Sequence, residues 1–69
     1  MMNHPNRSSI KKIATAHGVR LARRHRGYSL HGFLSDCESA AREINEHQVM
    51  RNLPRFFIER ADTGFYLQA

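Results

Sequence analysis

The sequence has little that could cross-link the chain or carry it through a membrane. It contains one cysteine, Cys37, and no tryptophan among its 69 residues. A single thiol cannot form an internal disulfide, which suits a reducing compartment. No apolar run approaches the roughly 18 residues of a membrane span, and the start MMNHPNRSS lacks the apolar segment of a signal peptide. We therefore expect a soluble cytoplasmic protein.

Residues in a catalytic or metal-binding arrangement are also lacking. The five histidines fall in different predicted elements and include no pair spaced four residues apart on a helix: His4, His17, His25, His31 and His47. Cys37 has no second thiol at ligand spacing, and it falls on the apolar face of a predicted helix, as a buried core thiol does. We therefore expect no metal, no cofactor and no enzymatic activity.

Acidic residues are absent from the first half of the chain. Residues 1–34 carry seven cations and no acid, whereas residues 35–69 carry four cations and six acids, and together they give the net charge of +5. This asymmetry predicts one basic surface, which suits an anionic partner such as nucleic acid or an acidic protein surface. The alternative is a solvated basic face that only keeps a small protein in solution.

The chain is long enough for one small domain. A chain of this length buries only about 60% of the surface that its unfolded form exposes, so a partner or a homodimer would add stability. Residues 1–7 are polar and contain a proline, and we expect them to form a disordered tail. Residues 8–69 are expected to form a single domain.

The first half of this domain predicts a helix followed by a hairpin. Ser8 or Ser9 is a candidate N-cap for a helix over residues 9–17, and Gly18 stands where a left-handed glycine would end it. Residues 19–24 then have the period of a strand, in which Val19 and Leu21 share one side and residues 20, 22 and 24 share the other. A short loop over residues 25–27 leads into a second strand that starts at Tyr28.

The second half repeats the order of helix and hairpin. Ser35 and Glu38 match a capping box, which predicts a helix that ends by Asn52, because Pro54 disfavours helical backbone before it. A last hairpin follows, with a turn over residues 62–64 and its glycine in the left-handed conformation. The prediction is an α+β domain of order α-β-β-α-β-β, with an antiparallel sheet packed on helices.

A helix-turn-helix is the alternative for the first half. Ala14 and Gly18 have the spacing of its small residue and its turn glycine, and residues 20–27 would be the recognition helix. However, Arg24 falls where that helix must bury an apolar side chain, and Gly27 would shorten it to about two turns. The pattern therefore favours the hairpin.

The candidate binding residues are cationic and aromatic. The predicted basic partner-binding face comprises Arg20, Arg23, Arg24, Arg26, Lys11 and Lys12, and His31 would extend it if it shares the exposed side of the hairpin. In the last hairpin the core needs Phe56, Ile58, Phe65 and Leu67. Phe57 and Tyr66 are then available for a protein interface, or alternatively for stacking on bases.

The runs IATAHGVRLARRHRGYSLHGFLSDCESAAREIN and PRFFIERADTGFYL carry a resemblance over roughly residues 10 to 67. The chain resembles small accessory proteins of temperate and satellite phages, nearest to the short derepression (antirepressor) proteins of P4-like satellites. The resemblance implies a non-enzymatic regulator that acts in a bacterial host cell by binding a phage repressor. It assigns no functional residue.

Two other functions remain open. One is a small basic DNA-binding transcriptional regulator, with its arginines on phosphates and guanine edges. The other is an inhibitor of a host defence complex of the anti-CRISPR type. In the first of these, nucleic acid would take the place of the regulatory protein as the partner.

Overall fold

The computed structural model describes residues 5–69, with the helix side chains from residue 7. The described elements are α1 (Pro5–Ala16), β1 (Arg20–Arg24), β2 (Gly27–His31), α2 (Leu34–Met50), β3 (Phe57–Ala61) and β4 (Gly64–Gln68). This confirms the predicted α+β class and the order α-β-β-α-β-β. Over residues 5–69, no helix is both long and apolar enough to cross a membrane.

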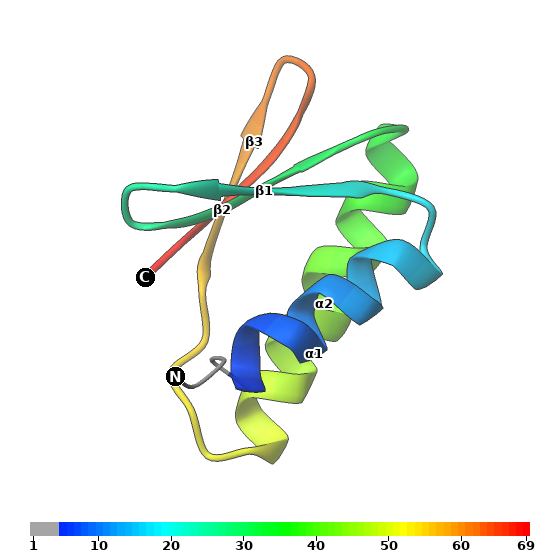
Figure 1. Ribbon diagram of the computed structural model, residues 1–69. Coiled ribbons are helices and arrows are strands. Elements are labelled where there is room, and N and C mark those ends of the chain that lie inside the picture. The colour runs from blue at the N-terminus through cyan, green and yellow to red at the C-terminus, as the bar shows by residue number, and fades with distance from the viewer. Residues whose placement is uncertain (1–4) are drawn as a thin grey trace.

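The four strands form one antiparallel sheet in the order β1-β2-β4-β3. The two hairpins meet where β2 pairs with β4, so that Leu30 lies opposite Phe65 and Tyr28 lies opposite Leu67. This order leaves β1 and β3 at the two edges. Figure 1 shows α1 and α2 side by side on the same side of the sheet.

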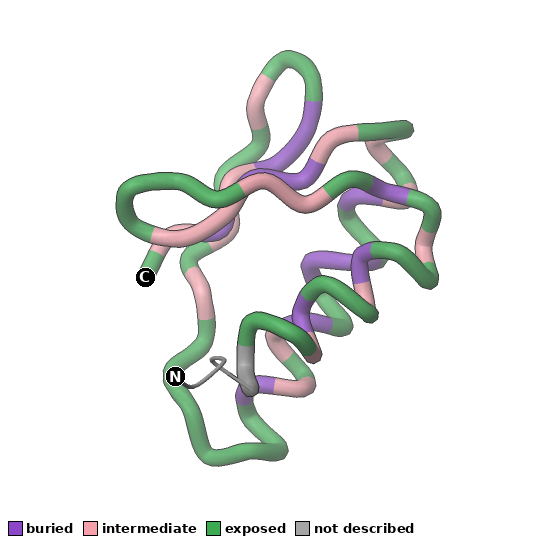
Figure 2. The backbone as a smooth tube through the Cα atoms, viewed as in Figure 1, coloured by how far each residue is buried: buried purple, intermediate pink, exposed green. Residues whose placement is uncertain are grey.

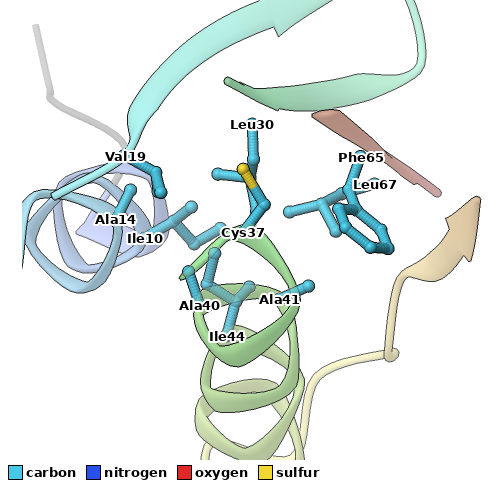
Figure 3. Close-up of a cluster of buried hydrophobic side chains, with 10 residues drawn as sticks. All are labelled: Ile10, Ala14, Val19, Leu30, Cys37, Ala40, Ala41, Ile44, Phe65 and Leu67. Atoms are coloured by element: carbon cyan, nitrogen blue, oxygen red, sulfur yellow. The ribbon is translucent and has the colours of Figure 1, made fainter. Parts of the chain in front are cut away.

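The core fills the space between the helices and the sheet. The largest fully buried side chains come from both layers: Ile10, Leu30, Cys37, Ile44 and Leu67. Figure 3 shows them meeting in one cluster, with small side chains such as Ala14 and Ala40 where the helices approach each other. Figure 2 shows the buried residues along the inner faces of the helices and the exposed residues at the hairpin tips.

The start of α1 differs from the prediction. The helix begins at Pro5, so Ser8 and Ser9 lie inside it and neither is its N-cap. Proline suits the first helical position, because its fixed φ is already helical and its missing N–H would have had no partner within the helix. Of the residues predicted as a tail, 5–7 belong to α1 and 1–4 lie outside the described residues.

The end of α1 agrees with the prediction. Gly18 has φ +73°, and its N–H donates to the carbonyl of Thr15 at 2.9 Å, while the N–H of Val19 donates to the carbonyl of Ala14 at 3.0 Å. This pair of bonds is the Schellman motif, in which a left-handed glycine lets the chain reverse. Val19, 5% exposed, therefore enters the core directly before β1.

The predicted capping box at the start of α2 is wrong. The N-cap is Phe33, without a side-chain capping bond, and Ser35 lies in the first turn. The earlier start brings the half-buried Leu34 against the core. Fully burying a leucine contributes about 1.5–3 kcal/mol and a capping side chain about 0.5–2 kcal/mol, so the contact of the half-buried Leu34 can offset the missing cap.

Two further expectations are resolved by the strands. Residues 20–24 are a strand and residues 25–26 a turn, so the helix-turn-helix interpretation of this segment is wrong. Gly64 does not have the predicted left-handed conformation but lies at the start of β4. A Cβ atom there would overlap the carbonyl oxygen of Leu30, so glycine is needed for the close approach of two strands rather than for a turn.

Candidate functional site

The side of the sheet that faces away from the helices is the candidate binding surface, and we call it the open face. Paired residues of neighbouring strands lie on the same side, and side chains alternate along each strand. Because Leu30 and Leu67 face the core, the alternate residues form the open face: Arg20, Ala22, Arg24, Gly27, Ser29, His31, Phe57, Glu59, Ala61, Gly64, Tyr66 and Gln68. Within residues 5–69, no helix covers this side (Figure 1).

Arg24 and Tyr66 form the central contact of the open face. The guanidinium carbon of Arg24 lies 3.9 Å from the centre of the Tyr66 ring, within the range of a cation–π interaction. Arg24 is on β1 and Tyr66 on β4, with β2 between them. The residue paired with Arg24 on β2 is Gly27, which has no side chain to obstruct the arginine. The contact places a cation over the middle of the sheet.

His31 lies on the open face, so the condition under which it would extend the basic face is met, and its Cα partner is Arg20. The Nε2 atom of His31 is 2.8 Å from the hydroxyl of Ser29, which is 3% exposed. This hydrogen bond satisfies a buried hydroxyl and fixes the imidazole at one end of the face. Arg20 is exposed beside it.

The two predicted interface aromatics lie on the open face with these cations. Phe57 is 68% exposed on the edge strand β3, and Tyr66 is half-buried on β4. The residues predicted for the core have the opposite orientation: Phe65 and Leu67 are buried, and Phe56 and Ile58 pack partly buried against them. The alternation in the last hairpin therefore predicted correctly which residues face the core and which face away from it.

The predicted basic face is divided among different parts of the molecule. Arg20 and Arg24 lie on the open face, but Arg23 is paired with Tyr28 and lies on the other side of the sheet. Lys11 and Lys12 are exposed on α1, in the helix layer, and Arg26 is exposed in the turn between β1 and β2. Helical and strand periods place neighbouring cations in different directions, so the six residues do not all lie on the open face.

The single thiol is part of the core. Cys37 is 0% exposed on the inner face of α2. Burial, and to a smaller extent the negative charge of Asp36, raises the pKa of its thiol above the ordinary value. Its placement agrees with the predicted core role. In the part of the chain that is described, no three histidine, cysteine or acidic side chains are grouped so that they could hold a metal ion.

Sequence reasoning missed two polar contacts that position the elements. The Asn45 side chain donates to the carbonyl of Phe56 at 3.0 Å and accepts from its N–H at 2.7 Å, which fixes the chain just before β3. His17 Nε2 lies 2.7 Å from a carboxylate oxygen of Glu43 and joins the end of α1 to α2. Both pairs are distant in the sequence, so no local pattern indicates them.

A groove of about 520 Å³ lies on the helix side of the sheet, away from the open face. It runs between the C-terminal half of α2 and the start of β3, and Val49, Met50 and Ile58 supply apolar lining. Arg42 and Arg55 lie at it together with Glu46, so its charge is mixed. The two surfaces therefore differ in chemistry: the open face combines exposed arginines with aromatic rings.

The fold and the open face define a small α+β domain with a four-stranded antiparallel sheet that is covered on one side. No known protein family, curated protein or solved structure matches the chain.

Proposed function

We propose that the protein is a non-enzymatic binding protein that docks its open face on an acidic surface of a regulatory protein, such as a phage repressor, and inhibits it. The observation that carries the proposal is the stacking of Arg24 on Tyr66 in the middle of the open face, which no helix of the described residues covers. Arg20 and Phe57 lie on the same side. Arginine, tyrosine and phenylalanine are enriched in protein interfaces.

The distribution of charge favours a protein partner over DNA. Proteins that bind DNA tightly make about 6–10 phosphate contacts through lysine and arginine. The open face offers Arg20 and Arg24 to such a backbone, and it also carries the carboxylate of Glu59. Lys11, Lys12 and Arg23 lie elsewhere, as described above. Binding to a short acidic patch on a protein requires fewer cationic side chains than binding along the phosphates of a DNA strand.

The experiment compares two double variants with equal charge. Arg20→Ala with Arg24→Ala removes two cations from the open face, and Lys11→Ala with Lys12→Ala removes two cations from α1. Each tagged variant is used to capture proteins from a lysogen, and the captured regulator is then purified and titrated against the same variants. We expect the arginine variant to lose at least about tenfold in affinity and the lysine variant to bind as the wild type does.

The two variants separate a specific surface from a general effect of net charge. Equal losses in both variants would show that the arginines only contribute solubilising charge, and the proposal would be wrong. The same would follow if the arginine variant relieved repression in a reporter assay as well as the wild type. Circular dichroism of both variants checks that the fold is retained.

A further inference from the structure

The edge strand β1 has backbone groups available for a further strand. The N–H of Ala69 donates to the carbonyl of Arg26 at 2.8 Å, so the backbone groups of Arg26 face β4. Backbone groups alternate in direction along a strand, so those of Gly27, Ser29 and His31 face β1. Their partners on β1 are residues 24, 22 and 20, which bond inward. The N–H and carbonyl groups of Leu21 and Arg23 therefore point outward.

No other strand of the described residues lies beside this outer edge, because the sheet order begins with β1. An edge strand with free backbone groups can be extended by an incoming strand, which gains main-chain hydrogen bonds. Val19, the next residue with outward backbone groups, donates its N–H to Ala14 instead. The available length is therefore the strand Arg20–Arg24 itself.

The charge of β1 determines which strand can pair with it. Three of its five residues are arginines, and all three are exposed. Two copies of β1 paired with each other would bring six arginines together, and like charges on neighbouring strands are destabilising. An incoming strand with acidic side chains would be attracted instead. The edge therefore disfavours self-pairing and favours an acidic partner.

The other edge strand, β3, does not favour an acidic or a basic partner strand. β3 contains Glu59 next to Arg60, so its charges are balanced, and Phe57 adds an apolar side chain. A strand at β3 would meet no excess of either sign. The charge complementarity that selects an acidic segment is found at β1.

We propose that an extended acidic segment of the partner protein adds to β1 as a fifth strand. This inference rests on the function proposed above and specifies how the partner is held. The segment needs an acid opposite Arg20, whose side chain is on the open face, and an acid opposite Arg23 on the other side. The residue opposite Leu21, which is half-buried against the core, is apolar.

The spacing of β1 gives the sequence of such a segment. The residues opposite positions 20 to 23 read Glu-Val-Thr-Glu if the segment is parallel to β1, and Glu-Thr-Val-Glu if it is antiparallel. The probes are two fluorescent peptides of about ten residues that contain one of these sequences between neutral flanks. A peptide of the same composition with both acids adjacent is the control for net charge.

Two variants at one position separate strand addition from charge attraction. Arg23→Ala removes the charge and keeps the outward N–H, whereas Arg23→Pro removes both. Proline is tolerated at an edge strand when its missing N–H would have faced solvent, so the sheet is expected to persist, and urea unfolding checks this. The comparison uses whichever of the two peptides binds the wild type more tightly. We expect Arg23→Pro to bind this peptide at least about fivefold more weakly than Arg23→Ala does, since the proline variant loses one main-chain hydrogen bond.

A second readout is the exchange of amide hydrogens. Peptide binding should slow the exchange of the Leu21 and Arg23 amides in the wild type, because both become donors in the new ladder. Equal affinity of Arg23→Pro and Arg23→Ala, or unchanged exchange at Leu21, would overturn strand addition. If the Arg20→Ala with Arg24→Ala variant still loses binding to the regulator in that case, the proposed function stands and the manner of docking is wrong.

Discussion

Arg24 stacks on Tyr66 across an intervening strand, with the guanidinium carbon 3.9 Å from the ring centre. The contact joins β1, at one edge of the sheet, to β4 in the second hairpin. It orders a long side chain over the open face before any partner arrives. An arginine that is ordered before binding loses less conformational entropy when the partner binds, so the free-energy cost of binding is lower.

The first prediction concerns the strength of this contact. A double-mutant cycle of Arg24→Ala and Tyr66→Leu should give a coupling free energy of about 0.5–1 kcal/mol, the range of exposed cation–π pairs. Tyr66→Phe keeps the ring and its contact with Arg24, so a cycle of Arg24→Ala and Tyr66→Phe should give a coupling free energy close to zero. Urea unfolding measures both cycles. Additive effects of Arg24→Ala and Tyr66→Leu would mean that the two side chains do not interact in solution.

The second prediction concerns Gly27, where β2 closely approaches β4. Its φ is +150°, and a Cβ atom would overlap the carbonyl oxygen of Leu67. Gly27→Ala should therefore cost about 3 kcal/mol or more, because strained backbone and a backbone clash combine. Gly18→Ala is the control: its φ is +73° and nothing lies near the added atom, so it should cost about 1–2 kcal/mol. Equal losses would contradict the close approach of β2 and β4.

The third prediction tests the start of α2. Ser35 lies in the first turn and the N-cap Phe33 makes no side-chain capping bond. Ser35→Ala should then change the free energy of unfolding by less than about 0.5 kcal/mol, as surface substitutions usually do. Leu34→Ala, which removes a half-buried contact with the core, should cost more. A loss of about 1 kcal/mol or more in Ser35→Ala would instead support the capping box.

The fourth prediction follows from the raised pKa of the Cys37 thiol, which is caused mainly by burial. The folded state then favours the neutral thiol relative to the unfolded state. Its contribution to stability is constant below the ordinary thiol pKa and is lost as the pH rises toward the folded value. The stability of the wild type should therefore fall more steeply with alkaline pH than that of Cys37→Ala. Parallel curves from urea unfolding would disagree with a buried thiol.

The sequence predicts the elements well where local chemistry decides them. Gly18 ends α1 because a left-handed glycine is required there, and the strands follow from alternation of apolar and polar residues. The same alternation correctly placed Phe57 and Tyr66 on one side of the sheet and Phe65 and Leu67 on the other. Each of these predictions uses residues within a few positions of one another.

Other features depend on contacts between distant residues and were not predictable. Leu34 begins α2 early because it packs on a core assembled from other elements. The pairing of Arg24 with Tyr66 depends on the sheet order, since β2 pairs with β4 rather than with β3. The division of the predicted basic residues has the same cause: Lys11 lies on α1 and Arg20 on β1, which belong to different layers.

The most direct test of the central claim is a pair of anisotropy titrations, one with the acidic peptides and one with a random-sequence DNA duplex. We expect the peptides to bind at near-physiological salt and the duplex to show no saturable binding there. Micromolar binding of the duplex that weakens by about 10³ or more between about 50 and 200 mM salt would indicate six or more phosphate contacts. That result, without peptide binding, would contradict an acidic protein partner and support a DNA-binding regulator.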